Sequence, residues 1–207
     1  TETEALVKKS GRRFLSIDAN LISIEPCTRI VDETVKTFGR IDILVNNAGI
    51  IRRCDSVDFS EKDWDDVINI NLKSLFFMCQ TAGRPMIKQG SGKIINICSM
   101  LSFQGGIRVP SYTAAKSGVA GLTRLLANEW ASKNVNVNGI APGYMATDNT
   151  KALRADEKRS AEILGRIPAG RWGTPADVGG TAVFLASSAA DYLHGAIIPV
   201  DGGWMAR

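Results

Sequence analysis

A tyrosine and a lysine stand four residues apart in the run S-Y-T-A-A-K-S-G, at Tyr112 and Lys116. Residues at this spacing are neighbours on one face of a helix, so the phenol and the ammonium can approach each other if the segment is helical. A phenol ordinarily keeps its proton to about pH 10, and a nearby cation favours the phenolate. The pair is therefore a candidate general acid and base. The same spacing also arises by accident, so the pair alone does not decide the function.

The elements that must position this pair follow from alternating apolar runs and helical periods. Five short apolar runs predict β-strands at residues 13–17, 41–45, 93–98, 135–140 and 196–200. Helices are predicted between them, at residues 28–38, from 60 to beyond 76, at 111–132 and at 175–187. This alternation is typical of a parallel sheet with helices on both faces. We therefore predict a single α/β domain over residues 1–207, with a doubly wound, Rossmann-like sheet.

Composition excludes several classes of function. The 207 residues are 44% hydrophobic and 22% charged, which suffices for one sizeable core. The net charge of +4 is spread without a basic run, so no nucleic-acid partner is expected. Four widely spaced cysteines and the single histidine, His194, predict neither a metal site nor a disulfide framework, which fits a reducing cytoplasm. No apolar run is long enough for a membrane span, so no membrane partner is expected.

Two glycine-containing loops follow predicted strands. N-N-A-G follows residues 41–45, and A-P-G follows residues 135–140. In an open parallel sheet, ligands bind at the loops that leave the carboxyl ends of the strands. Gly49 and Gly143 lack a Cβ and could let a flat cofactor approach the backbone. Each loop taken alone could equally be an ordinary turn.

Together these pieces follow one order along the chain. That order is Asn46-Asn47-Ala48-Gly49 after a strand, Asn71 in the next helix, Ser99 ending the following strand, then Tyr112, Lys116 and Pro142-Gly143. It resembles the short-chain dehydrogenase/reductase family over essentially the whole chain. The resemblance implies an NAD-linked oxidoreductase in which the protein supplies orientation, a proton and electrostatic stabilisation.

The same resemblance implies four catalytic residues. Tyr112 would give a proton to the carbonyl oxygen in reduction and remove it in oxidation. Lys116 would lower the pKa of the phenol and hold the nicotinamide ribose. Ser99 would hydrogen-bond the substrate oxygen, and Asn71 would support a water that links Lys116 to solvent. An alternative for Asn71 is a structural bond to a neighbouring backbone group.

The resemblance also implies a cofactor site. Its residues would be Tyr112 and Lys116, with Asn46, Ala48 and Gly49 on the adenosine side, and Pro142, Gly143 and Thr147 at the nicotinamide end. Either Asp18 or Asn20 would meet the adenine, and the charge of Asp18 favours it. NAD is expected and NADP is not excluded, because the residue that normally discriminates them, at the end of the family's second strand, does not occur in this sequence.

One part of the family pattern is absent. The glycine-rich turn T-G-x-x-x-G-x-G, which presents a helix N-terminus to the diphosphate, does not occur before Asn46. In the family's sheet, whose strand order is 3-2-1-4-5-6, residues 13–17 would be the third strand and residues 41–45 the fourth. The first and second strands, which would lie between these two in the sheet, are missing. Residues 41–45 would then lie at an exposed sheet edge. We expect an N-terminally truncated chain, with about 40 residues preceding Thr1 in the natural protein.

Arginines near these loops suggest an anionic substrate. Arg52 and Arg53 follow N-N-A-G-I, and Arg108 precedes Tyr112 by four residues. A guanidinium suits a planar carboxylate, so Arg52 and Arg108 are predicted, with Ser99, to contact the substrate. The arginines between residues 144 and 171 follow the Pro-Gly loop, where the family places a lid, but a solvated helical surface explains most of them better.

Longer runs narrow the resemblance within the family. N-N-A-G-I-I-R-R, Q-G-G-I-R-V-P-S-Y and R-I-P-A-G-R-W-G are similar to members that interconvert keto and hydroxy sugar acids, which implies an anionic sugar-acid substrate and a homotetramer. Two alternatives stay open. A 3-oxoacyl-carrier-protein reductase shares the catalytic set and prefers NADPH. A non-catalytic scaffold on the same fold is the other, because fold does not fix function.

Overall fold

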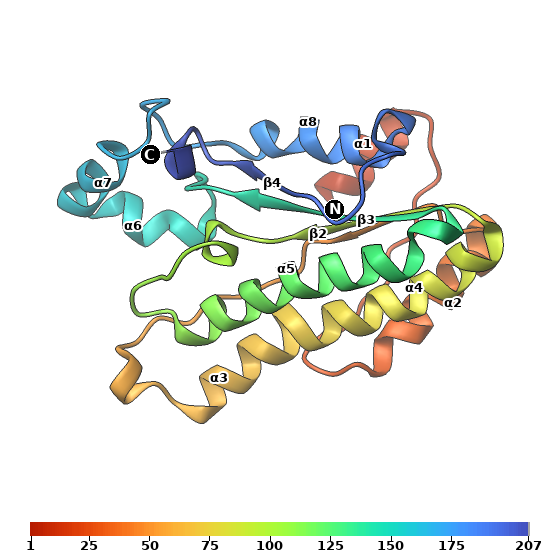
Figure 1. Cartoon of the computed structure of the whole chain (residues 1–207), viewed down its shortest axis with the longest axis horizontal. Helices are drawn as coiled ribbons and strands as arrows, with labels where there is room; N and C mark the ends of the chain where they lie inside the picture. The colour runs from red at the N-terminus through yellow and green to blue at the C-terminus, as the bar shows by residue number, and fades with distance from the viewer. Residues whose placement is uncertain (207) are drawn as a thin grey trace.

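The computed structural model describes residues 1–206, and its centre is a parallel sheet. The strands are β1 (Ile43–Asn46), β2 (Gly92–Ile97), β3 (Val135–Pro142) and β4 (Ile197–Val200). They pair in the order β1-β2-β3-β4, all parallel (Figure 1). Four of the five predicted strands are therefore confirmed, with ends shifted by one or two residues.

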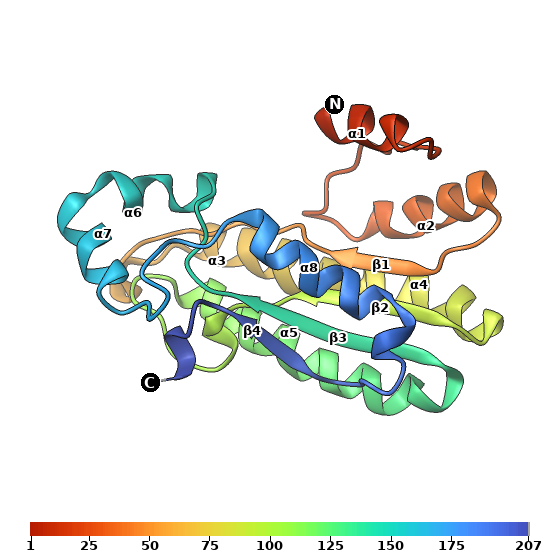
Figure 2. The same cartoon turned by 90° about the horizontal axis from the view of Figure 1, so that it is seen from above.

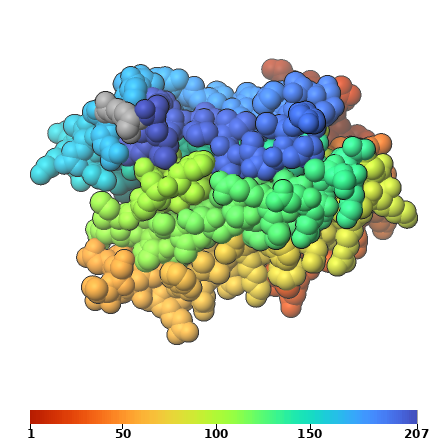
Figure 3. Space-filling model, in the orientation of Figure 1, coloured from red at the N-terminus to blue at the C-terminus, as the bar shows by residue number. Residues whose placement is uncertain are grey.

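Helices cover both faces of this sheet, as predicted. On one face lie α4 (Leu75–Gln89) and α5 (Pro110–Trp130), with α2 (Glu25–Phe38) packed against α4. On the other face α8 (Pro175–Ala186) packs against β2, β3 and β4 (Figures 1 and 2). In the space-filling view the C-terminal part of the chain forms the upper layer and the α3–α5 region the lower one (Figure 3). None of the described helices is both long and apolar enough to cross a membrane.

The remaining helices extend these layers. The helix α3 (Glu61–Ile68) runs through a π-helical turn, Asn69–Ser74, directly into α4. Beyond the carboxyl end of β3 lie two short helices, α6 (Lys151–Ala155) and α7 (Glu157–Leu164), at one end of the molecule (Figure 2). The first helix, α1 (Glu2–Lys9), stands apart from the sheet on the side of β1 (Figure 2).

Local sequence signals explain where the helices begin and end. The Oγ of Ser60 accepts a hydrogen bond from the backbone N–H of Asp63 at 3.1 Å, which caps α3. Gly39 ends α2 with φ 88°, a left-handed conformation that favours glycine. Pro110 occupies the first turn of α5, where its missing N–H costs nothing. The helix that carries Tyr112 and Lys116 is thus fixed by short-range signals.

The strand predicted at residues 13–17 is wrong. The structure has irregular backbone there, because a strand is stable only beside a hydrogen-bonded neighbour, and β1 pairs only with β2 in the described part of the chain. The expected sheet edge is confirmed at β1, where Ile43 and Val45 are each 46% exposed. The expectation that residues precede Thr1 stays a prediction.

The core lies on both sides of the two central strands. Ile94 faces the cluster under α4 and α5, and Ile95 faces the cluster under α8, each with 1% of its surface exposed. Burying one such side chain contributes about 1.5–3 kcal/mol. Gly83 of α4 lies against Trp130 of α5, where a Cβ would come within 2.7 Å of the indole ring. Strands that are apolar on both faces thus form a rigid platform for the loops at their ends.

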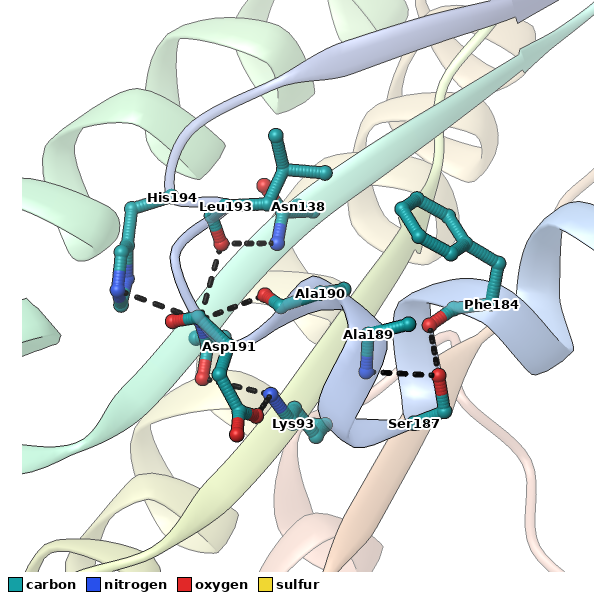
Figure 4. A network of polar contacts seen from close by, with 10 residues as sticks. Lys93, Asn138, Phe184, Ser187, Ala189, Ala190, Asp191, Leu193 and His194 are labelled. Carbon is teal, nitrogen blue, oxygen red and sulfur yellow. Dashed lines mark hydrogen bonds and ion pairs between the residues drawn. The ribbon is translucent and has the colours of Figure 1, made fainter.

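A polar network holds the amino ends of the central strands. The Lys93 ammonium on β2 contacts the Asp191 carboxylate at 2.5 Å and the Asn136 Oδ1 on β3 at 3.0 Å. Asn136 Nδ2 donates in turn to the carbonyls of Asp191 and Leu193, at 2.9 and 3.0 Å. Figure 4 shows the Lys93 side chain reaching Asp191 and the Asn138 amide on the Leu193 carbonyl. The loop before β4 is therefore tied to the sheet.

Candidate active site

Lys116 is the buried cation at the carboxyl ends of the strands. Only 4% of its surface is exposed, and its Nζ donates to the carbonyl of Ile97, the last residue of β2, at 2.6 Å. The same Nζ lies 5.6 Å from the centroid of the Tyr112 ring. The helical spacing of Tyr112 and Lys116 therefore brings the two side chains together. No sequence signal marked the Ile97 carbonyl as the acceptor, because every residue carries one.

The protonation of this pair differs from the expectation. Burial raises the pKa of Tyr112, while a hydrogen bond with Ser99 and the positive charge of Arg53 oppose that rise. The expected lowering of the pKa by Lys116 is not among the causes. Burial also lowers the pKa of Lys116 to about 8. The ligand-free protein therefore holds Tyr112 as the neutral phenol, the form that donates a proton.

Ser99 lies immediately beyond β2, beside the phenol. Only 9% of the surface of Ser99 is exposed, and its Oγ accepts a hydrogen bond from the backbone N–H of Leu101 at 3.2 Å. That bond orients the hydroxyl at the start of a short 3-10 turn, Met100–Ser102, while the hydrogen bond with Tyr112 lowers the pKa of the phenol. Two hydroxyls and an ammonium thus converge where a carbonyl oxygen could bind.

Asn71 is fully buried in the π-helical turn between α3 and α4. Its Nδ2 donates to the carbonyl of Ile50 at 2.8 Å, and its Oδ1 accepts from the Ile50 N–H at 2.9 Å. These bonds are the structural alternative considered for this residue, and they hold the loop that follows N-N-A-G. An amide has a second donor and a second lone pair, so a bond to water is compatible with this arrangement. The water-supporting role stays a prediction.

The residues predicted for the adenosine side divide into an interior and an exposed group. Asn46 turns its amide into the protein, where Nδ2 donates to Asn96 Oδ1 at 2.9 Å and to Cys79 Sγ at 3.1 Å. Ala48 and Gly49 are exposed. A small pocket reaches Ala48, and it is lined by Leu21, Asn46, Ala48, Ile70, Ser74, Leu75 and Met78. Of the three predicted residues, Ala48 and Gly49 therefore present an exposed surface, whereas Asn46 is partly buried.

The Pro142-Gly143 loop packs against the end of β4. A Cβ on Gly143 would come within 2.6 Å of the Asp201 Cα, so packing alone demands glycine there. Thr147 lies just before the segment that leads into α6. The rings of Tyr144 and Trp172 meet edge to face, with their centroids 5.6 Å apart. A larger pocket opens beside this loop, lined by Tyr144, Met145, Ala169, Arg171, Gly173, Asp177, Val200, Asp201 and Gly202.

The adenine candidates remain equivalent. Asp18 is exposed, and its carbonyl accepts a hydrogen bond from Arg29 at 2.7 Å. The Asn20 Oδ1 accepts from the Ile22 N–H at 3.1 Å, so that side chain stabilises its own turn. Neither geometry decides between Asp18 and Asn20, and the role of Asp18 stays a prediction.

The two arginines predicted to contact substrate already have carboxylate partners. Arg52 Nε lies 3.3 Å from Asp63 Oδ1, and Arg108 Nε lies 3.0 Å from Asp55 Oδ1. Arg53, which the prediction of substrate contacts left out, is the arginine whose charge acts on Tyr112. Adjacent arginines look alike in a sequence, so only their partners distinguish them.

The residues fit one end of a nicotinamide dinucleotide. Lys116 has three N–H donors, and the Ile97 carbonyl is the one hydrogen-bond acceptor it has among residues 1–206. The remaining donors suit ribose hydroxyls, and the hydroxyls of Ser99 and Tyr112 suit a substrate oxygen. The diphosphate-binding turn is not among these residues. In the same described range no cluster of three or more His, Cys, Asp or Glu side chains could hold a metal ion.

Comparison with known proteins agrees with this geometry. A family model described as "Enoyl-(Acyl carrier protein) reductase" matches residues 1–205. The 2-dehydro-3-deoxy-D-gluconate 5-dehydrogenase of Escherichia coli (strain K12) is 67% identical, with 100% of this chain and 82% of that protein covered. The chain belongs to the short-chain dehydrogenase/reductase family. Members of this family are NAD(P)-dependent oxidoreductases.

Two further members extend the comparison. The 2-dehydro-3-deoxy-D-gluconate 5-dehydrogenase of Bacillus subtilis (strain 168) is 57% identical over 100% of this chain and 81% of its own length. A crystal structure of a gluconate 5-dehydrogenase from Burkholderia cenocepacia J2315, in complex with NADP and tartrate, superposes with a TM-score of 0.95. It is 36% identical and covers 100% of this chain, which covers 81% of it. The short-chain dehydrogenase/reductase architecture is thus shown by sequence and by structure.

Proposed function

We propose that this protein interconverts a keto and a hydroxy sugar acid with NAD(H), as a 2-dehydro-3-deoxy-D-gluconate 5-dehydrogenase, an activity also described as 2-deoxy-D-gluconate 3-dehydrogenase. The observation that carries the proposal is the 67% identity to the Escherichia coli enzyme of the first name, because that match extends over the whole chain. The convergence of Ser99, Tyr112 and Lys116 supports it, since these groups suit proton transfer at a carbonyl.

The chain's own residues would manage the proton and the developing charge. In reduction, neutral Tyr112 gives its proton to the substrate oxygen, and Ser99 donates a hydrogen bond to the same oxygen. In oxidation, the proton moves from the hydroxyl to the phenolate. Lys116 lies beside the ring, with its Nζ 5.6 Å from the ring centroid, where its ammonium would contact the phenolate that oxidation uses. When bound, the nicotinamide cofactor supplies or accepts the hydride.

The cofactor site is proposed on the same residues. Lys116 and Tyr112 would hold the nicotinamide ribose, with Pro142, Gly143 and Thr147 beside the ring and Asn46, Ala48 and Gly49 toward the adenosine. Asp18 would meet the adenine. We propose NAD as the preferred cofactor, although the related gluconate 5-dehydrogenase was crystallised with NADP. Direct titration therefore has to include both nucleotides.

The proposal is tested first by binding and then by turnover. The protein has four tryptophans, whose fluorescence can be followed during titration with NADH and then NADPH. We expect tighter binding of NADH, followed by turnover of 2-dehydro-3-deoxy-D-gluconate in the presence of NAD. Tight NADH binding without turnover of any sugar acid would overturn the proposal that the substrate is a sugar acid. Binding only by a form extended upstream would show that residues 1–207 carry the catalytic groups but not the diphosphate site.

A second candidate is a reductase of acyl groups on a carrier protein. The description of the matching family model names an acyl-carrier-protein reductase, and such an enzyme would use the same three catalytic groups. Preference for NADPH together with reduction of a 3-oxoacyl carrier protein would favour it. A non-catalytic scaffold would instead be indifferent to loss of the Tyr112 hydroxyl.

Assembly and location are also proposals. We propose a homotetramer in the cytoplasm, acting on a small anionic sugar acid without nucleic-acid or membrane partners. Light scattering at several concentrations measures the mass directly, and a stable monomer or dimer would contradict the tetramer.

A further inference from the structure

The proposed catalytic groups come from two elements that meet at a short turn. Ser99 lies just beyond β2 and begins the 3-10 turn Met100–Ser102, whereas Tyr112 and Lys116 lie on α5. Two groups that act on one substrate oxygen have to keep their spacing to within about 0.5 Å. The bonds between this turn and α5 therefore set the geometry of the proposed site.

Ser102 forms a hydrogen bond on each side of this junction. Its Oγ donates to the carbonyl of Lys116 at 2.7 Å and accepts from the backbone N–H of Ser99 at 3.3 Å. A serine hydroxyl has one donor and two acceptor lone pairs, so both bonds form at the same time. The side chain is half-buried. One hydroxyl thus connects the backbone of Ser99 to the backbone of Lys116.

The end of the sheet leaves the polar groups of Ser99 to the turn. The preceding residue, Cys98, still donates its N–H to the carbonyl of Ile140 on β3 at 2.7 Å. The N–H of Ser99 instead donates to Ser102, and the Ser99 Oγ accepts from the N–H of Leu101 at 3.2 Å. Both the backbone and the hydroxyl of Ser99 are therefore oriented by the turn, and Ser102 fixes that turn to α5.

A second serine crosses the same junction and offers a matched comparison. The exposed Ser117 on α5 donates from its Oγ to the carbonyl of Leu101 at 3.1 Å. Like Ser102, it joins the turn to the helix through one hydroxyl and one backbone carbonyl. Its bond ends on neither Ser99 nor Lys116. The two serines therefore differ in whether their bonds reach the proposed catalytic residues.

We propose that Ser102 is a positioning residue, whose hydroxyl holds Ser99 at the spacing from Tyr112 that lets both hydroxyls meet one substrate oxygen. The inference rests on the proposed function and deepens it. In this role Ser102 contacts neither the substrate nor the cofactor and acts through Ser99. Without its hydroxyl, the Ser99 N–H and the Lys116 carbonyl lose the group that joins them.

Steady-state kinetics test the effect on turnover. We expect Ser102→Ala to lower kcat fivefold to tenfold, about the loss expected for one hydrogen bond, while the KM for the sugar acid changes little. Ser117→Ala should keep kcat within about twofold, although it removes a bond of the same kind. Wild-type kcat in Ser102→Ala would overturn the proposal. An equal loss in Ser117→Ala would also overturn it, because any bond across the junction would then serve.

The titration of Tyr112 in the ligand-free protein separates this proposal from the proposed function. The hydrogen bond with Ser99 lowers the pKa of Tyr112, so displacement of Ser99 should raise it. The protein has three tyrosines, whose ¹³Cζ NMR signals can be followed with pH, and Tyr112→Phe identifies the signal of Tyr112.

We expect the Tyr112 signal to titrate at higher pH in Ser102→Ala than in the wild type, and at the wild-type pH in Ser117→Ala. An unchanged titration in Ser102→Ala overturns the positioning role, whatever the enzyme turns over. If the wild-type protein turns over no sugar acid, the proposed function fails, and the same titration still decides whether Ser102 holds Ser99 beside the phenol.

Discussion

Polar side chains lie at both ends of the central strands, but those at the amino ends have more hydrogen-bond partners than those at the carboxyl ends. At the amino ends, Lys93 contacts both a carboxylate and an amide oxygen, and Asn136 donates to several carbonyls of the loop before β4 (Figure 4). At the carboxyl ends, Lys116 is more deeply buried than Lys93 but has the carbonyl of Ile97 as its acceptor. Both lysines contact β2, so the difference lies in their partners.

This contrast distinguishes a structural polar cluster from a functional one. A buried polar group without enough partners costs free energy, so folding alone favours the arrangement around Lys93. Around Lys116, some N–H donors of the ammonium have no hydrogen-bond acceptor among residues 1–206. Burial lowers the pKa of Lys116 to about 8. Perturbed groups of this kind concentrate at functional sites because their unused capacity is available to a ligand. Unused hydrogen-bonding capacity, rather than polarity, distinguishes the end of the sheet where we propose the active site.

The largest expected effect is loss of the phenol at the active end. Tyr112→Phe should lower kcat by about 10³-fold, as expected for loss of a general acid, while affinity for the nucleotide changes little. Steady-state kinetics with the sugar acid and fluorescence titration with NADH measure the two quantities. Tyr192→Phe, at a fully exposed residue beside the Lys93 cluster, is the control and should keep full activity. Retention of turnover by Tyr112→Phe would contradict the catalytic assignment.

The next effect concerns Lys116 and the pH dependence of stability. Its folded-state pKa of about 8 lies below the ordinary value of 10.5. Between these values the unfolded chain binds the proton and the folded chain does not, so the contribution of Lys116 to the free energy of unfolding rises with pH from about 8 to 10.5. The full rise is about 3 kcal/mol. Urea unfolding of the ligand-free protein at several pH values measures it.

The comparison variant for that experiment is Lys116→Met, which removes the titrating group. We expect this variant to be more stable than the wild type at pH 7, with a difference that shrinks as the pH rises from about 8 to 10.5, and to lose most of its turnover. A stability difference that does not change with pH would show that burial does not depress the pKa of Lys116.

The smallest effect is expected at the amino ends. Lys93→Met removes the ammonium from Asn136 Oδ1 and Asp191, and an unpaired buried acceptor costs about 1–2 kcal/mol. Turnover should stay within about twofold, because no catalytic group is touched. Unfolding in urea at pH 7 and steady-state kinetics test both statements. A variant that is as stable as the wild type but inactive would reverse the proposed division between the two ends.

Much of the fold could be predicted because its signals are local. Ser60, Gly39 and Pro110 mark helix ends by caps and backbone preferences that involve only a few neighbouring residues. The apolar runs at β2 and β3 predicted buried strands, and the spacing of Tyr112 and Lys116 predicted their contact. Periodicity fixes which residues share a face, whatever the rest of the chain does.

Strand pairing, the direction of pKa shifts and the choice of ion-pair partners depend on residues that are distant in the sequence, so the tertiary structure alone decided them. Residues 13–17 have the composition of a strand, but the described residues 1–206 offer them no neighbouring strand to hydrogen-bond. The pKa of Tyr112 rises rather than falls because desolvation, which no local pattern reveals, outweighs nearby charge. Arg52 and Arg53 are adjacent and chemically identical, and only the carboxylates of α3 leave one paired and the other available. Sequence determines which chemistry each residue can perform, whereas packing determines which of those groups stay unsatisfied and therefore free to act.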